Sequence, residues 1–179
     1  MNAHNTGYVR TVKAAVVRDG IQYAFSARLR QSRKEAHKII IASPWIGYGD
    51  IRRGPLTSIV STIDTCRIPT YVFTRQPQNN THIQAVNALM RCPYIEIVYN
   101  NNLHAKLYIC MAPYPYGFAI IGSANLTSGS EALYEIGLLI LAQGGGEEIV
   151  KELASFGLDY LRTRPDSRII KRFSFRRLP

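Results

Sequence analysis

The sequence predicts an α/β fold in which a mixed, largely parallel β-sheet is flanked by helices on both faces. Short apolar runs rich in β-branched and aromatic residues alternate with segments of helical periodicity. Apolar residues make up 46% of the chain, which is enough for one well-packed core. A length of 179 residues is too short for two ordinary domains. We therefore expect a single domain over residues 1–179, with a basic C-terminal extension at about 162–179.

The first half of the chain alternates between strand and helix patterns. Residues 1–20 give no clear pattern. The predicted helices after them span 21–36, 57–66 and 80–91, and the predicted strands span 38–43, 70–74 and 94–99. Short connections between such elements are typical of a parallel sheet with helices packed on it.

The pattern changes after residue 100. Three strand-like runs follow closely, at 104–110, 118–122 and 133–142, and the loop 111–117 is expected to join the first two as a hairpin. A glycine run then precedes a predicted helix over 147–161, which carries acidic residues in its first turn.

Charge and cysteine content narrow the classes of function. The net charge of +10 favours polyanionic partners. The three cysteines are widely spaced and lack a C-x-x-C pattern, so neither a disulfide framework nor a zinc knuckle is expected. The sequence shows no signal peptide, no run long enough to span a bilayer and no long amphipathic segment with an exposed apolar face. We expect a cytoplasmic protein with no membrane partner, no metal and no cofactor.

Five polar residues lie near the ends of three successive predicted strands, where we expect their side chains to be close together. His104 and Lys106 stand two apart on a predicted strand, so both side chains point to the same face. Ser123 and Asn125 end the next strand, where small and amide-bearing residues suit close approach to a phosphate. Glu135 lies early in the third strand, where a carboxylate is placed to hydrogen-bond a histidine ring.

This pattern, His104-x-Lys106 followed by Gly122-Ser123-x-Asn125, resembles the signature of the phospholipase D superfamily, best between residues 38 and 142. The resemblance implies a phospholipase D-like αβα sandwich. It also implies that the histidine is the nucleophile and forms a covalent phosphohistidine. The lysine, serine and asparagine then grip the phosphate, and two copies of the motif build one active site.

One position departs from the family pattern. The family places an aspartate, which orients the nucleophilic histidine, where this chain has Met111. Glu135 is the candidate replacement. A His-Ala-Lys-Leu-Tyr run and a later glutamate are similar to the restriction-endonuclease-like branch of the family, which favours nuclease over lipid hydrolysis.

The chain carries the motif once, so the family mechanism implies a homodimer with the site across a two-fold interface. We expect a metal-independent endonuclease acting on nucleic acid, with DNA favoured over RNA, and possible assembly into a larger restriction or defence complex. The alternatives are a lipid phosphodiesterase and a non-catalytic nucleic-acid-binding module. The basic residues expected to hold nucleic acid are Arg162, Arg164, Arg168, Lys171, Arg172, Arg176 and Arg177.

Overall fold

The computed structural model describes residues 11–47, 54–127 and 134–174 and contains one eight-stranded sheet in the order β1-β7-β6-β5-β2-β3-β4-β8. The strands are β1 (Val12–Arg18), β2 (Lys38–Ala42), β3 (Thr70–Thr74), β4 (Ile95–Tyr99), β5 (Leu107–Met111), β6 (Phe118–Gly122), β7 (Ile136–Gly144) and β8 (Arg168–Lys171). The helices are α1 (Ile21–Ser32), α2 (Pro55–Cys66), α3 (Asn80–Arg91) and α4 (Gly146–Ser155), and α4 continues into the π-helical turn η2 (Phe156–Leu161).

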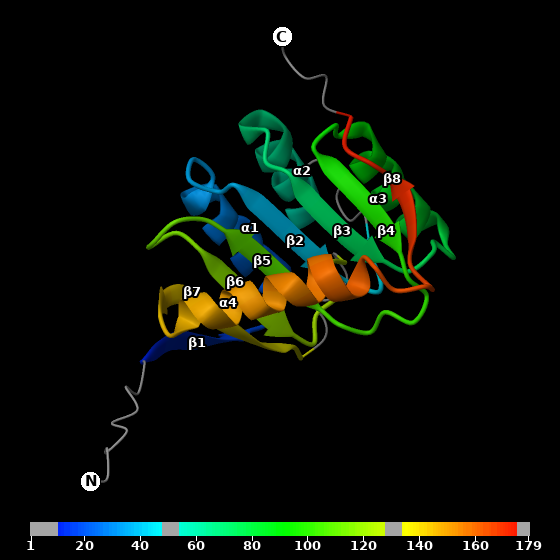
Figure 1. Cartoon of the computed structure of the whole chain (residues 1–179). Helices are drawn as coiled ribbons and strands as arrows, with labels where there is room; N and C mark the ends of the chain where they lie inside the picture. The colour runs from blue at the N-terminus through cyan, green and yellow to red at the C-terminus, as the bar shows by residue number, and fades with distance from the viewer. Residues whose placement is uncertain (1–10, 48–53, 128–133, 175–179) are drawn as a thin grey trace, which may run out of the picture.

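Helices cover both faces of the sheet, as predicted. The helices α1, α2 and α3 pack on one face, where Phe25, Ile59 and Leu89 share a core with the sheet. The helix α4 crosses the other face, where Val150 and Ala154 pack against a second core (Figure 1). The central strands β2, β3 and β4 are therefore buried on both sides, which explains their nearly continuous apolar sequences.

The expectation of a largely parallel sheet is wrong. Only β2–β3 and β3–β4 pair in parallel, and the other five pairs are antiparallel. The strands β5, β6 and β7 are consecutive in the sequence and adjacent in the sheet, and no described helix lies between them, an arrangement typical of antiparallel strands. The strand–helix alternation in the first half predicts its parallel part correctly, but that part holds only three strands.

The predicted elements recur with shifted ends. The helix expected over 21–36 ends at Ser32, and the helix expected over 57–66 begins at Pro55, a residue suited to the first turn. The strand expected over 133–142 runs over Ile136–Gly144, and Leu133 lies outside the described residues. Two edge strands were not predicted, namely β1 and β8.

In the parts of the chain that the structure describes, no helix combines the length and the apolar character needed to cross a membrane.

Candidate active site

The residues predicted to be catalytic lie at one edge of the sheet, and three of them, His104, Lys106 and Ser123, line one hollow there. The strands β2, β3, β4 and β6 end at this edge, and β5 and β7 begin there, because β5 and β7 run antiparallel to their neighbours. Residues just before β5, just after β6 and just before β7 are therefore neighbours in space. The carboxyl ends of parallel strands are also a common place for ligands in α/β proteins.

His104 and Lys106 lie in the loop before β5, so the expectation that both stand on a strand is wrong. The β5 ladder begins at Leu107, opposite Ala42, and β2 ends there at a Ser43-Pro44 pair that cannot extend it. Both side chains nevertheless line one hollow of about 660 Å³. Its other lining residues include Ser123 from the end of β6 and Leu153 and Phe156 from α4 and η2.

Lys106 is half-buried, and its surroundings favour the loss of its proton. Burial is the largest cause of its lowered pKa, and the positive charge of Arg75 lowers it further. The carboxylate of Glu135 acts in the opposite direction. The Lys106 Nζ donates to the backbone oxygen of His104 at 3.1 Å, which holds the two residues of the motif together. An anionic ligand in the hollow would restore the stability of the charged amine.

Glu135 lies just before β7 and does not line the hollow, but its charge acts on Lys106. Its backbone is fixed by Asp19, since Glu135 N donates to Asp19 Oδ1 at 3.1 Å and Asp19 N donates to Glu135 O at 3.0 Å. Burial raises the pKa of the Glu135 carboxyl, the charge of Asp19 raises it further, and the charge of Lys106 partly offsets both. The Glu135 Oε2 is buried and has no hydrogen-bond partner among the described residues. No hydrogen bond joins Glu135 to His104, although such a bond was expected.

Ser123 and Asn125 have different surroundings. The Ser123 hydroxyl accepts a hydrogen bond from Ile136 N at 3.2 Å and the Ser123 N donates to Ile136 O at 3.0 Å, so Ser123 ties the end of β6 to the start of β7. The Asn125 Oδ1 is buried and has no partner in the described part of the chain. Of the two, Asn125 is the one with unused hydrogen-bonding capacity.

Two buried residues hold the Asn125 segment in place. The Tyr108 hydroxyl donates to Ala124 O at 2.8 Å, and Leu126 N donates to Ser43 Oγ at 2.9 Å. Tyr108 is fully buried, and this burial is the largest cause of the strongly raised pKa of its phenol. The residues on both sides of Asn125 are therefore anchored to the core. The sequence analysis missed Ser43 and Tyr108, because their role depends on contacts between distant segments.

Position 111, where the family has an aspartate, lies at the other end of β5 from His104. Met111 pairs with Lys38 at the start of β2, and four residue steps separate it from Leu107. At about 3.3 Å a step this is roughly 13 Å. A side chain at this position therefore does not reach His104 within one chain.

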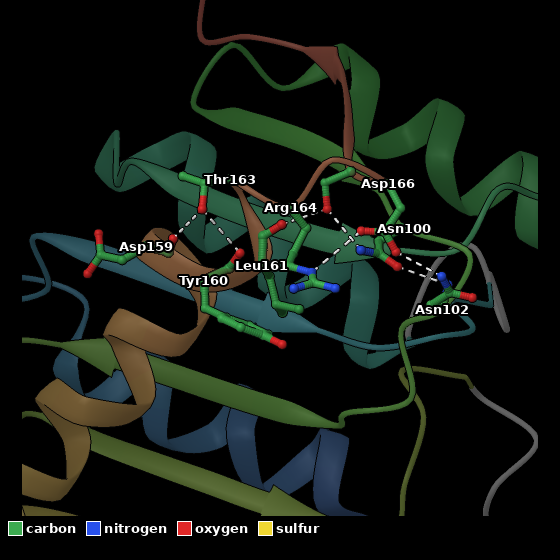
Figure 2. Close-up of polar contacts among 9 residues, drawn as sticks. Asn100, Asn102, Asp159, Tyr160, Leu161, Thr163, Arg164 and Asp166 are labelled. Carbon is green, nitrogen blue, oxygen red and sulfur yellow. Dashed lines mark hydrogen bonds and ion pairs between the residues drawn. The ribbon is translucent and has the colours of Figure 1, made fainter.

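Polar contacts brace the loop that carries His104 (Figure 2). The Asn100 Oδ1 accepts from Asn102 N at 2.9 Å, and its Nδ2 donates to Ser167 Oγ at 2.9 Å. The Asn102 Nδ2 donates to Asp166 Oδ2 at 2.8 Å. The turn before β8 thus holds the loop before β5, and these two segments are far apart in the sequence.

Arg75, the residue that follows β3, also supports this loop. Its Nε donates to Leu103 O at 2.8 Å, directly before His104, and its guanidinium lies over the ring of Trp45 at 5.5 Å. Sequence reasoning missed Arg75. Its position just after a predicted parallel strand is the signal that points to it.

The basic residues near the C-terminus are not equivalent. Arg162 Nε donates to Glu96 Oε1 at 2.7 Å, where Glu96 is only 2% exposed. Lys171 Nζ donates to the backbone oxygens of Leu89 and Cys92. Both side chains therefore bind groups within the protein, which makes them less suited to contact nucleic acid.

The remaining predicted nucleic-acid contacts are more open. Arg164 forms an ion pair with Asp166 at 3.7 Å and lies over Tyr160 at 5.2 Å, while Arg168 and Arg172 are exposed. Arg176 and Arg177 lie outside the described residues.

Across the described ranges, no three histidine, cysteine, aspartate or glutamate side chains gather in a way that could hold a metal ion.

Comparisons with known proteins support the fold. No family model matches the chain, and no curated protein matches it. The crystal structure of Nuc from Salmonella typhimurium, a phospholipase D family member, is similar with a TM-score of 0.61 at 13% identity, over 90% of this chain and 100% of Nuc.

Two further solved structures give the same result. NucT from Helicobacter pylori has a TM-score of 0.59 at 16% identity, over 85% of this chain and 97% of NucT. Phosphatidylserine synthase from Haemophilus influenzae Rd KW20 has a TM-score of 0.58 at 11% identity, over 91% of this chain and 41% of that protein. The chain therefore has the phospholipase D-like fold that the motif implies.

Proposed function

We propose that this protein is a metal-independent endonuclease that hydrolyses nucleic-acid phosphodiester bonds through a covalent phosphohistidine. The observation that carries the proposal is the shared hollow of His104 and Lys106 at the carboxyl edge of a phospholipase D-like sheet. An exposed histidine beside a half-buried lysine is suited to attack phosphorus while the lysine binds the phosphate. The net charge of +10 favours a polyanionic substrate.

The reaction takes two steps. A ring nitrogen of His104 attacks phosphorus, the N–P bond forms, the bond to the leaving oxygen breaks, and a second histidine gives that oxygen a proton. Water then loses a proton to the second histidine, forms an O–P bond and displaces His104. Lys106 and the Asn125 amide stabilise the charge on the phosphoryl oxygens, so the scheme assigns no step to a metal.

The second histidine is assigned to another copy of the chain. The other described histidines are unsuitable, since His37 lies beside Met111 at the opposite edge and His82 is buried and packs edge-to-face against Trp45. An exposed apolar patch continues from the hollow along β6, β7 and β1, and it consists of Val16, Ile121, Ile136 and Leu138. We propose that this patch packs against the same patch of a second copy, which brings two His104 residues to one site.

The first test measures cleavage of plasmid and of single-stranded oligonucleotides in excess chelator. We expect the wild type to cleave them and His104→Ala to lose at least about 10³-fold in rate. Vesicles of phosphatidylcholine and cardiolipin are tested in parallel. Cleavage of lipid alone would favour a lipid phosphodiesterase, and nucleic-acid binding without turnover, unchanged by His104→Ala, would favour a binding module.

The dimeric site is tested by mixing subunits. The wild type and His104→Ala are co-expressed in equal amounts with different tags, so that random pairing leaves about one quarter of the dimers with two histidines. If each site uses both histidines, activity per total protein falls to about one quarter, whereas independent subunits would retain about one half.

A further inference from the structure

A polar groove opens further along the edge of the sheet that carries the candidate active site. It has a volume of about 280 Å³ and lies where β3 and β4 end and β8 begins. Its lining residues are Gln76, Tyr99, Asn101, Asp166, Arg168 and Ile170. The hollow of His104 and the groove of Arg168 are therefore two openings along one edge of the same sheet.

The groove offers hydrogen-bond donors and a positive charge. Arg168 is exposed and, within the described ranges, no acidic side chain pairs with it. The Asn101 Oδ1 accepts from Gln76 N at 3.0 Å, which leaves the Asn101 Nδ2 as the unused donor of that amide.

The one carboxylate among the lining residues of the groove, Asp166, already has partners within the protein. Asp166 accepts a hydrogen bond from Asn102 Nδ2 at 2.8 Å and pairs with Arg164 at 3.7 Å. The hydrogen bond from Asn102 is the largest cause of the lowered pKa of Asp166. The groove is therefore better suited to the phosphates and sugars of a nucleic-acid strand than to a cation.

Arg75 lies between the groove and the active site. Its Nε holds Leu103 O, while its two Nη groups have no acceptor among the residues that the structure describes. Its charge is near enough to Lys106 to contribute to the lowered pKa of that amine. In the order β5-β2-β3-β4-β8, the cations Lys106, Arg75 and Arg168 follow one another along the edge.

We propose that one strand of nucleic acid runs along this edge, with its cleaved phosphodiester at His104 and a later part of its backbone in the groove of Arg168. This inference rests on the proposed function and adds a second binding site for the same substrate. Four strand spacings of about 4.8 Å separate β5 from β8, or roughly 19 Å. At about 3.4 Å per nucleotide of a stacked strand, this distance corresponds to about six nucleotides.

The distance makes binding depend on substrate length. Fluorescence anisotropy of labelled single-stranded oligothymidylates, a trimer and a dodecamer, is measured on His104→Ala to prevent turnover. A trimer is too short to reach both openings. Adding Arg168→Ala is expected to weaken dodecamer binding about 5- to 10-fold and to lower the slope of log affinity against log salt by about 0.7. Trimer binding is expected to change less than about two-fold, because the lost contact lies beyond its reach.

Two further variants control for net charge and for side-chain shape. Lys34→Ala removes a positive charge from the exposed turn before β2, at the opposite edge of the sheet, and Arg168→Lys keeps the charge. We expect Arg168→Lys to recover most of the salt dependence and Lys34→Ala to affect both oligonucleotides alike. The inference is overturned if Arg168→Ala changes neither affinity, changes both equally, or acts as Lys34→Ala does. Length-dependent binding without cleavage by the wild type would overturn the proposed function alone.

Discussion

At the scale of single residues, Glu135 has a position that lowers the stability of the folded protein when its carboxyl is ionised. Its pKa is raised, first by burial and then by the charge of Asp19, so folding penalises the ionised carboxyl relative to the unfolded chain. The resulting loss of free energy of unfolding is complete at pH values above the raised pKa. It disappears as the pH falls below the ordinary carboxyl value. A side chain kept in such a place is typical of a functional site.

Replacing Glu135 by glutamine is therefore expected to stabilise the protein while removing activity. We expect Glu135→Gln to raise the free energy of unfolding at pH 8 by up to about 1 kcal/mol, with the gain vanishing near pH 3. Urea denaturation across this pH range measures it, and cleavage is expected to fall at least about 10²-fold. The control is Glu35→Gln, in an exposed turn. A loss of stability at pH 8 would assign Glu135 a structural role instead.

The sequence predicts which residues share the site better than it predicts their contacts. His104, Lys106 and Ser123 line one hollow, and Glu135 influences Lys106, as their spacing around a hairpin implies. The pattern does not reveal Tyr108, and of Arg75 it reveals only the position just after a predicted strand. Their roles arise from pairing of β2 with β3 and β5, segments far apart in the chain. Long-range pairing of this kind leaves no mark in local periodicity.

At the scale of elements, the turn η2 illustrates how a charged segment is built into a fold. Its end at Leu161 leads directly to Arg162, whose guanidinium pairs with the buried Glu96 of β4 and lies 5.8 Å from the ring centre of Tyr71. From the sequence, Arg162 begins a run of positive charge, which favours a nucleic-acid contact. Its partner lies 66 residues away in the chain, so only the fold reveals it.

Loss of this ion pair is expected to weaken the attachment of η2 to the sheet. We expect Arg162→Ala to lower the free energy of unfolding by about 2–3 kcal/mol, because Glu96 is left buried without its cation. Urea denaturation monitored by circular dichroism measures the loss. Arg164→Ala, which removes an exposed pair, is the matched control and is expected to cost less than about 1 kcal/mol. Equal losses for both variants would contradict this reading.

The two strands that the sequence analysis missed, β1 and β8, both lie at an edge of the sheet. The strand β8 has only four residues, with a basic residue at each end, and β1 is exposed along most of its length. Charged and exposed residues are common on edge strands because they prevent pairing with other chains. In β8 they also leave only two adjacent apolar residues, a shorter run than that by which buried strands such as β2 are recognised. The direction of the outer strands is equally hidden, since it depends on connections rather than on composition.

At the scale of the whole molecule, one edge of the sheet and one of its faces expose different kinds of side chain. The carboxyl edge of the sheet gathers the cations Lys106, Arg75 and Arg168, whereas the face beside α4 exposes apolar side chains next to the hollow. Leu138 lies at the centre of that apolar patch, because it pairs with both Ile121 and Val16. Apolar groups in such a continuous arrangement are typical of protein interfaces.

A charge at the centre of the patch is therefore expected to separate the proposed dimer. Leu138 is 42% exposed, so Leu138→Lys can be accommodated by a monomer, but two lysines facing each other across a two-fold axis repel and remain poorly solvated. Sedimentation velocity is expected to show monomers, and cleavage is expected to fall with dimer content because each subunit then lacks the second histidine. Ile83→Lys, at a 43% exposed position on α3, is the matched control and should leave the dimer intact. A Leu138→Lys monomer with full activity would show that one His104 suffices, and the second proton transfer would then have to be assigned to a group within the same chain.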